Sequence, residues 1–146
     1  MTSSKYIKAI SSGIVIPEAK NDCTIRAVAN ATGISYDTIL RFCKESLSYK
    51  EGKGLFTKEV LTLFKEFGLT FLGSVGTTKQ ALFFKKYAED SPELPGATAE
   101  KALRIYSQGT YIFCISGHVF CVKDANIIDI GHSTNKNLRV VAVWKF

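Results

Sequence analysis

The sequence lacks long hydrophobic runs: no stretch of its 146 residues is both long enough and apolar enough to predict a membrane-spanning helix. Residues 1–5 also lack the apolar core of a secretory signal. We therefore expect a cytoplasmic protein without membrane contact, in which the four cysteines are reduced thiols. Repeats, linkers and low-complexity tracts are absent too, so we predict one domain spanning residues 1–146.

Clusters of basic residues are also missing, although the formal net charge is +6. The lysines are scattered, with loose groups at 50–58 and 79–86 and no run of five basic residues. This distribution is more typical of a positively biased, solvated surface than of a nucleic-acid footprint. The sequence therefore argues against nucleic acid as a partner, while the charge is compatible with an acidic partner protein.

Sequence signatures of cofactor and metal sites are absent as well. Residues 73–76 fall short of a phosphate-binding loop because they lack the Gly-Lys pair that should follow. Cys114, His118 and Cys121 lie close in sequence with His132 nearby, but their spacing does not match a zinc finger or knuckle. Alternation along a strand would also divide these side chains between two faces. We therefore predict neither a metal ion nor a cofactor.

What the sequence does contain is a change of hydrophobic period part-way along the chain. Up to Tyr106 the apolar residues recur mainly at helical spacing, and from Thr110 onward the segments are β-branched and aromatic, as in strands. Helices followed by an antiparallel sheet indicate the α+β class. The expected strands are 69–72, 110–115, 118–123, 127–130 and 138–144, and residues 5–17 are predicted to form a short strand or an extended lead-in.

Five helices are predicted from capping residues and apolar stripes. The first begins with Asp22 as its N-cap, carries Cys23 in its first turn and ends at Gly33, and its alanines indicate a central, buried helix. The fifth runs from about 99 to 106. The second, third and fourth are expected to be capped by Ser35, by Thr57 and by a capping box of Thr77 and Gln80. Their expected apolar faces are, in turn, Ile39, Leu40, Phe42, Cys43 and Leu47; Val60, Leu61, Phe64 and Phe67; and Leu82, Phe83, Phe84 and Tyr87.

Cys23 is a candidate nucleophile because of its place at the start of the first helix. The dipole and the unpaired N–H groups of a helix N-terminus favour a thiolate, and a neighbouring imidazolium favours it further. The alternative is a small buried apolar residue, a use that cysteine often has. For Cys43, Cys114 and Cys121, which lie in apolar patterns, we expect only that packing role.

His118 and Asp129 complete a candidate catalytic set. His118 follows Gly117 and opens a strand, where its side chain can face a cleft and the glycine lets a substrate come close. Asp129 is expected on the returning strand, where it can orient the imidazole unless a one-residue slip of register turns it to the opposite face. His132 competes for the role of base, but its polar loop is a less rigid support than the hairpin. The alternative for His118 is a hydrogen-bonded histidine without a catalytic role.

The segments 21–33 and 117–124, the latter followed by Asp129, resemble the papain-like cysteine peptidase fold. The closer likeness is to small stand-alone members similar to bacteriocin-processing peptidase domains, many of them encoded by phages or bacteria. The resemblance covers the chain from about residue 20 onward, and the order Cys, His, Asp fits. It implies Cys23 as nucleophile, His118 as general base and Asp129 as orienting carboxylate, in a papain-like domain whose N-terminal helices pack on a C-terminal antiparallel sheet.

One position departs from that family. Papain-like enzymes usually place a glutamine about six residues before the cysteine, to donate to the oxyanion, and Pro17 stands there. Asn21 could supply an amide donor beside the backbone N–H of Cys23. The resemblance implies a cysteine-dependent hydrolase or acyl-transfer enzyme acting on an amide, peptide or isopeptide bond of a protein or peptide, in the host cytoplasm if a phage encodes it. The alternative is a catalytically idle papain-like binding module, for example a phage-encoded inhibitor of a host protein.

Overall fold

A computed structural model describes residues 6–8, 22–47, 49–50, 55, 57–76, 79–87, 94–115, 118–129 and 139–146. Residues 6–8, 57, 80, 87 and 129 are described by their backbone alone. Thr77, which the sequence assigns to a capping box, lies outside the described residues.

The strands that the structure describes form one sheet in the order β1-β5-β4-β3-β6-β2. The five strands from β5 to β2 pair antiparallel with their neighbours, and β1 adds to β5 in parallel. The predicted α+β class is therefore confirmed, but β1 and the mid-chain strand β2 also belong to the sheet. The bounds are β1 (Tyr6–Lys8), β2 (Thr70–Ser74), β3 (Thr110–Ile115), β4 (His118–Lys123), β5 (Asn126–Asp129) and β6 (Ala142–Lys145).

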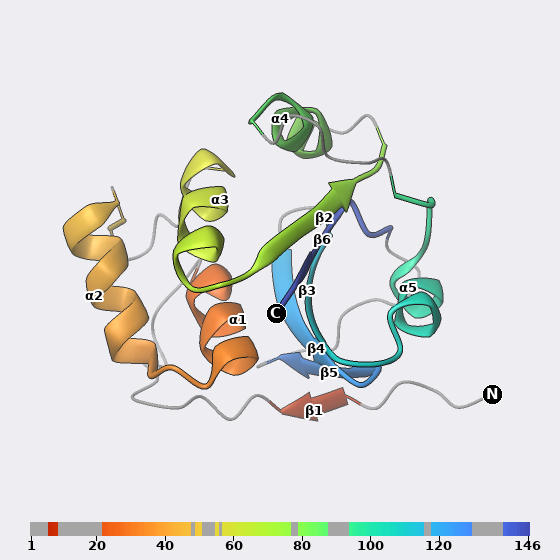
Figure 1. Ribbon diagram of the computed structural model, residues 1–146, viewed down its shortest axis with the longest axis horizontal. Helices are drawn as coiled ribbons and strands as arrows, with labels where there is room; N and C mark the ends of the chain where they lie inside the picture. Colours follow the sequence, from red (N-terminus) through yellow and green to blue (C-terminus); the bar gives the residue numbers. More distant parts are fainter. Residues whose placement is uncertain are drawn as a thin grey trace.

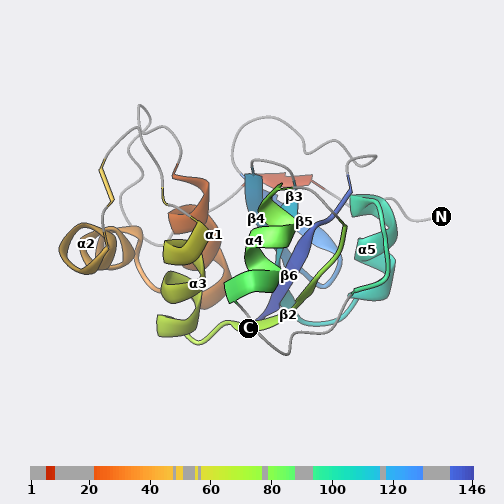
Figure 2. The same cartoon turned by 90° about the horizontal axis from the view of Figure 1, so that it is seen from above.

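Helices cover both faces of this sheet. Figure 1 shows α1, α2 and α3 on one side of the strands and α5 on the other, with α4 beside β2, and Figure 2 shows the same separation from above. Each face therefore has its own layer of helix. The bounds are α1 (Cys23–Thr32), α2 (Tyr36–Ser46), α3 (Thr57–Glu66), α4 (Lys79–Tyr87) and α5 (Ala99–Ile105).

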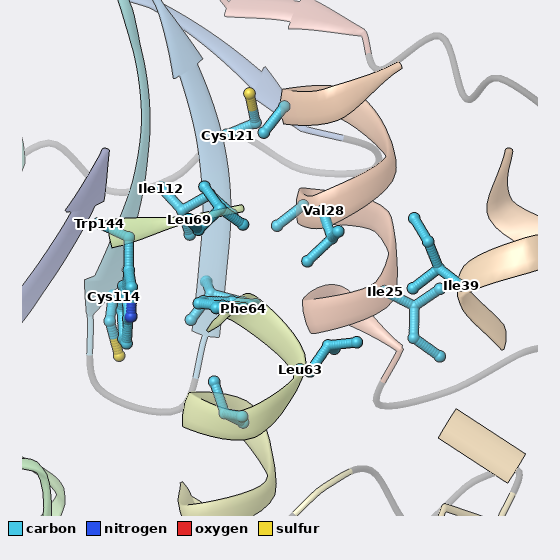
Figure 3. Packing of buried hydrophobic residues seen from close by; sticks show 14 of the residues in the cluster. Ile25, Val28, Ile39, Leu63, Phe64, Leu69, Ile112, Cys114, Cys121 and Trp144 are labelled. Atoms are coloured by element: carbon cyan, nitrogen blue, oxygen red, sulfur yellow. The ribbon is translucent and has the colours of Figure 1, made fainter. Parts of the chain in front are cut away.

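The two faces bury two hydrophobic clusters, which we call the α1-side cluster and the α5-side cluster. Alternation along β3 divides its residues between them, because Ile112 and Cys114 join the α1-side cluster while Phe113 joins the α5-side cluster. Figure 3 shows the α1-side cluster from close by, between α1, α3 and the strands. Trp144 lies edge-on to Phe64 there, with ring centroids 4.7 Å apart.

Helix α1 is the central helix that its alanines predict. Every residue from Thr24 to Ala31 is buried, because α1 lies between α2 and the sheet. Small side chains on several sides of the helix permit this close approach, and Ile25 and Val28 are fully buried. Each such side chain stabilises the fold by roughly 1.5–3 kcal/mol. Gly33 ends the helix in the left-handed conformation, with φ 78°.

Two expectations about the remaining elements are corrected. Leu82 and Phe83 of α4 were expected to face inward, but Leu82 is 51% exposed and Phe83 is 37% exposed. The inward positions are Ala81 and Phe84, which are three residues apart and so share one side of the helix. The last strand begins at Ala142 rather than at residue 138.

Candidate functional site

Cys23 is the first residue of α1 and follows Asp22 directly. Its side chain is half-buried and packs against the α1-side cluster, whereas the other three cysteines are buried. Burial raises the pKa of Cys43 and of Cys121 to about 12, so both stay protonated at neutral pH. This burial agrees with the packing role expected for the three cysteines. Cys23 differs from them because its side chain is partly exposed.

His118 begins β4, where it pairs with Ile115 across the hairpin. Its side chain is half-buried. The imidazole stacks on the ring of Phe120, with centroids 5.8 Å apart and planes inclined by 26°. Phe120 in turn belongs to the α5-side cluster.

Cys23 and His118 lie at the same end of the sheet. Cys114 of β3 links the two positions. It stands opposite Val119, which is the neighbour of His118 in β4. Burial raises the pKa of Cys114, and the nearby Cys23 raises it further. Helix α1 packs against β4, and Cys23 packs against the same hydrophobic cluster as Val119.

The same two residues are associated with opposite faces of the sheet. Cys23 packs against the α1-side cluster, together with Val119 of β4. His118 alternates with Val119 and stacks on Phe120, which points to the α5 side. The structure therefore brings the predicted nucleophile and base to one end of the sheet, with the end of β4 between them.

Asp129 is the last residue of β5, the strand that neighbours β4. Its backbone pairs with Lys8 of β1, and it follows Ile128, which stands opposite Cys121. The predicted orienting carboxylate thus comes from the strand adjacent to that of His118. Asn21, the predicted oxyanion donor, lies outside the described residues, and so do Pro17 and His132.

A buried network around Asp22 was not foreseen. Asp22 occupies the N-cap position of α1, as predicted, but its side chain makes no capping hydrogen bond. Arg26 donates to this carboxylate from Nε, 2.9 Å away, and Tyr36 donates from its hydroxyl at 2.7 Å. All three residues are at most 5% exposed. Burial, followed by the hydrogen bond to Asp22, raises the pKa of Tyr36.

Part of this network could have been found in the sequence. Asp22 and Arg26 are four residues apart, the spacing at which oppositely charged side chains meet on a helix. Tyr36 belongs to α2, and nothing in its local sequence points to Asp22.

The sequence was also searched for a metal site and for a membrane-spanning helix. Within the described part of the chain, no group of three or more His, Cys, Asp or Glu residues is arranged to hold a metal ion. No helix in that part has the length and apolar character needed to cross a membrane.

Comparison of the chain with protein-family models, with curated proteins and with solved structures finds no match.

Proposed function

We propose that the chain is a cysteine-dependent hydrolase or acyl-transfer enzyme that acts on an amide, peptide or isopeptide bond of a protein or peptide. One observation carries this proposal: of the four cysteines, Cys23 alone is not buried, and it begins a buried ten-residue helix. A thiol in this place is accessible to a carbonyl carbon and lies in the favourable field of the helix dipole.

In the proposed reaction, Sγ of Cys23 attacks the carbonyl carbon while His118 accepts the thiol proton. The backbone N–H of Cys23 stabilises the oxyanion, with the Asn21 amide as a second donor. The C–N bond then breaks, and His118 passes its proton to the leaving amine. Water, deprotonated by His118, hydrolyses the thioester and regenerates the thiol. Asp129, from the strand beside β4, orients the imidazole.

This reaction requires the imidazole of His118 to reach the sulfur around the end of β4. His118 is the first residue of that strand, so its side chain leaves the sheet at an end rather than from the middle. Rotation about its two side-chain torsions moves the ring away from Phe120 without breaking a backbone pair between β3 and β4. We therefore propose that the stack on Phe120 is a resting position and that the ring turns toward Cys23 when an acyl group is present.

The test uses p-nitrophenyl acetate as a simple acyl donor. Release of p-nitrophenolate measures turnover, and mass spectrometry measures acetylation of Cys23. We expect the wild-type chain to release several equivalents, Cys23→Ala to show only the spontaneous rate, and His118→Ala to lose about a hundredfold in rate because the general base is gone.

Matched controls separate these residues from their neighbours. His132→Ala removes the second of the two histidines and should leave the rate unchanged. Asp129→Asn should slow turnover, whereas Asp124→Asn should not, because Asp124 is an exposed turn residue that accepts a hydrogen bond from Gly109. A His118→Ala chain that turns over normally, or a loss confined to His132→Ala, would reject the assignment of the base.

The second candidate is a papain-like binding module without turnover. The stack of His118 on Phe120 favours it, because that contact associates the imidazole with the face of the sheet opposite to Cys23. In that case Cys23 is acetylated once and no turnover follows. An acidic host protein is then captured equally well by the wild-type chain and by Cys23→Ala.

A further inference from the structure

The carboxylate of Asp22 is held in a way that N-cap residues usually are not. An N-cap aspartate normally accepts hydrogen bonds from the first N–H groups of its helix. Here Nε of Arg26 lies 2.9 Å from both oxygens of the carboxylate, and the hydroxyl of Tyr36 lies 2.7 Å from Oδ2. The Arg26 guanidinium also sits over the Tyr36 ring, 5.4 Å from its centroid. Two donors therefore hold the carboxylate, and it makes no capping hydrogen bond to α1.

This arrangement matters for Cys23, which lies between Asp22 and Arg26 in the sequence. An unpaired carboxylate beside a thiol opposes formation of the thiolate, and a capping carboxylate also occupies N–H groups that an oxyanion would use. Arg26 is one turn further along α1, so its positive charge offsets the negative charge of Asp22 at the same end of the helix.

We propose that Arg26, together with Tyr36, is a positioning residue for the reaction of Cys23: it withdraws the Asp22 carboxylate from the start of α1 and cancels its charge there. This inference rests on the proposed function, because it assigns a role in preparing the same nucleophile. On the elements packed against α1, Cys114 of β3 is influenced electrostatically by Cys23, Tyr36 of α2 binds the Asp22 carboxylate, and His118 at the start of β4 stacks on Phe120. Burial raises the pKa of Cys114 and of Tyr36, so both are uncharged at neutral pH, and the Asp22–Arg26 pair supplies the charge beside Cys23.

The experiment measures the alkylation rate of Cys23 by iodoacetamide between pH 5 and pH 10, with site-specific detection by mass spectrometry. Arg26→Gln leaves the Asp22 charge uncancelled, so the rate curve should move to higher pH by about one unit, a loss of about tenfold at pH 6. Asp22→Asn leaves the Arg26 charge uncancelled, so the curve should move in the opposite direction. Arg26→Lys keeps the charge and should stay close to the wild-type curve.

The opposite signs distinguish this role from a structural one. If Arg26→Gln and Asp22→Asn move the curve in the same direction, or if neither moves it, the proposal is overturned. Thermal unfolding of each variant shows whether it is folded over the pH range. If Arg26→Gln does not fold, the comparison of Asp22→Asn with Arg26→Lys decides the question. Only Asp22→Asn is expected to react faster than the wild-type chain at low pH. Alkylation needs no turnover, so these outcomes are independent of the p-nitrophenyl acetate test of His118.

Discussion

The hydroxyl of Tyr36 donates a 2.7 Å hydrogen bond to Oδ2 of Asp22, and both residues are buried. Tyr36 is the first residue of α2, and Asp22 is the residue before α1. The bond therefore fixes the start of one helix against the start of the next, beside the cysteine that we propose as nucleophile.

Tyr36→Phe removes this bond and keeps the ring. Hydrogen bonds to charged groups contribute about 1.5–3 kcal/mol, so we expect the free energy of unfolding to fall by about 2 kcal/mol. Urea denaturation measures the change. The control is Tyr106→Phe, because Tyr106 packs through its ring against Tyr111 and Phe113 and should lose less than about 0.5 kcal/mol. Equal losses in the two variants would contradict the role given to the Asp22 bond.

The turn between β4 and β5 places two non-glycine residues, Asp124 and Ala125, in the left-handed region. Ala125 has φ 65°, a conformation that costs an L-residue roughly 1–2 kcal/mol. Ala125→Gly should therefore raise the free energy of unfolding by about 1 kcal/mol.

The converse substitution is Gly33→Ala, at φ 78°, where an added Cβ meets nothing within 4 Å. It should lose about 1 kcal/mol through backbone strain alone. Thermal melts of the two variants should thus move in opposite directions. Destabilisation by Ala125→Gly would mean that the methyl contact of Ala125 with the α5-side cluster outweighs the strain.

Alkaline pH should destabilise the fold through its buried thiols. Burial raises the pKa of Cys43 and of Cys121 from 9.0 to about 12. Below pH 9 both states hold these protons, and between pH 9 and pH 12 the unfolded chain releases them while the folded chain retains them. The free energy of unfolding should therefore fall by about 1.4 kcal/mol per pH unit for each thiol.

Urea titrations from pH 8 to pH 11 under reducing conditions measure this slope. Cys43→Ala removes one of the thiols, so its slope should be shallower than that of the wild-type chain by the contribution of a single group. Its absolute stability is not the readout, because the substitution also removes a buried side chain. Parallel curves for the two proteins would contradict the shift at Cys43.

The four cysteines should also differ in their reaction with iodoacetamide. Cys23 is half-buried and should be alkylated in the native protein, whereas Cys43, Cys114 and Cys121 require local or global opening. At pH 8 we expect Cys23 to react at least about tenfold faster than any other cysteine. Digestion and mass spectrometry after short exposure give the four rates. In denaturing urea the difference should disappear, and its persistence there would show that burial is not the cause.

Local signals in the sequence were enough to predict α1 and its ends. Gly33 marks the end of the helix by itself, because a left-handed stop depends on a few neighbouring residues. Asp22 stands at the predicted N-cap position, although its side chain binds Arg26 and Tyr36 instead of capping α1. The partners of the Asp22 carboxylate were not predictable in the same way. Tyr36 is fourteen residues away, and it meets Asp22 only after α1 and α2 have packed together.

The position of His118 shows a second limit. The sequence predicts that His118 begins a strand, and it does. Which face the side chain takes depends on register, because a shift of one residue reverses every side chain of a strand. The stack on Phe120 is therefore information that only the folded chain provides.

For α4 the limit is similar, since Leu82, Phe83 and Phe84 are equally apolar and only packing selects Phe84 as the buried residue.

The parallel pairing of β1 with β5 has a consequence for how the chain reaches its folded state. Tyr6 lies beside Ile127, so β1 is synthesised long before the strand that it pairs with exists. Contacts of such long sequence separation form slowly, and until this one forms the edge of β5 offers unpaired backbone groups to other molecules. During synthesis, association between nascent copies should therefore begin at residues 126–129.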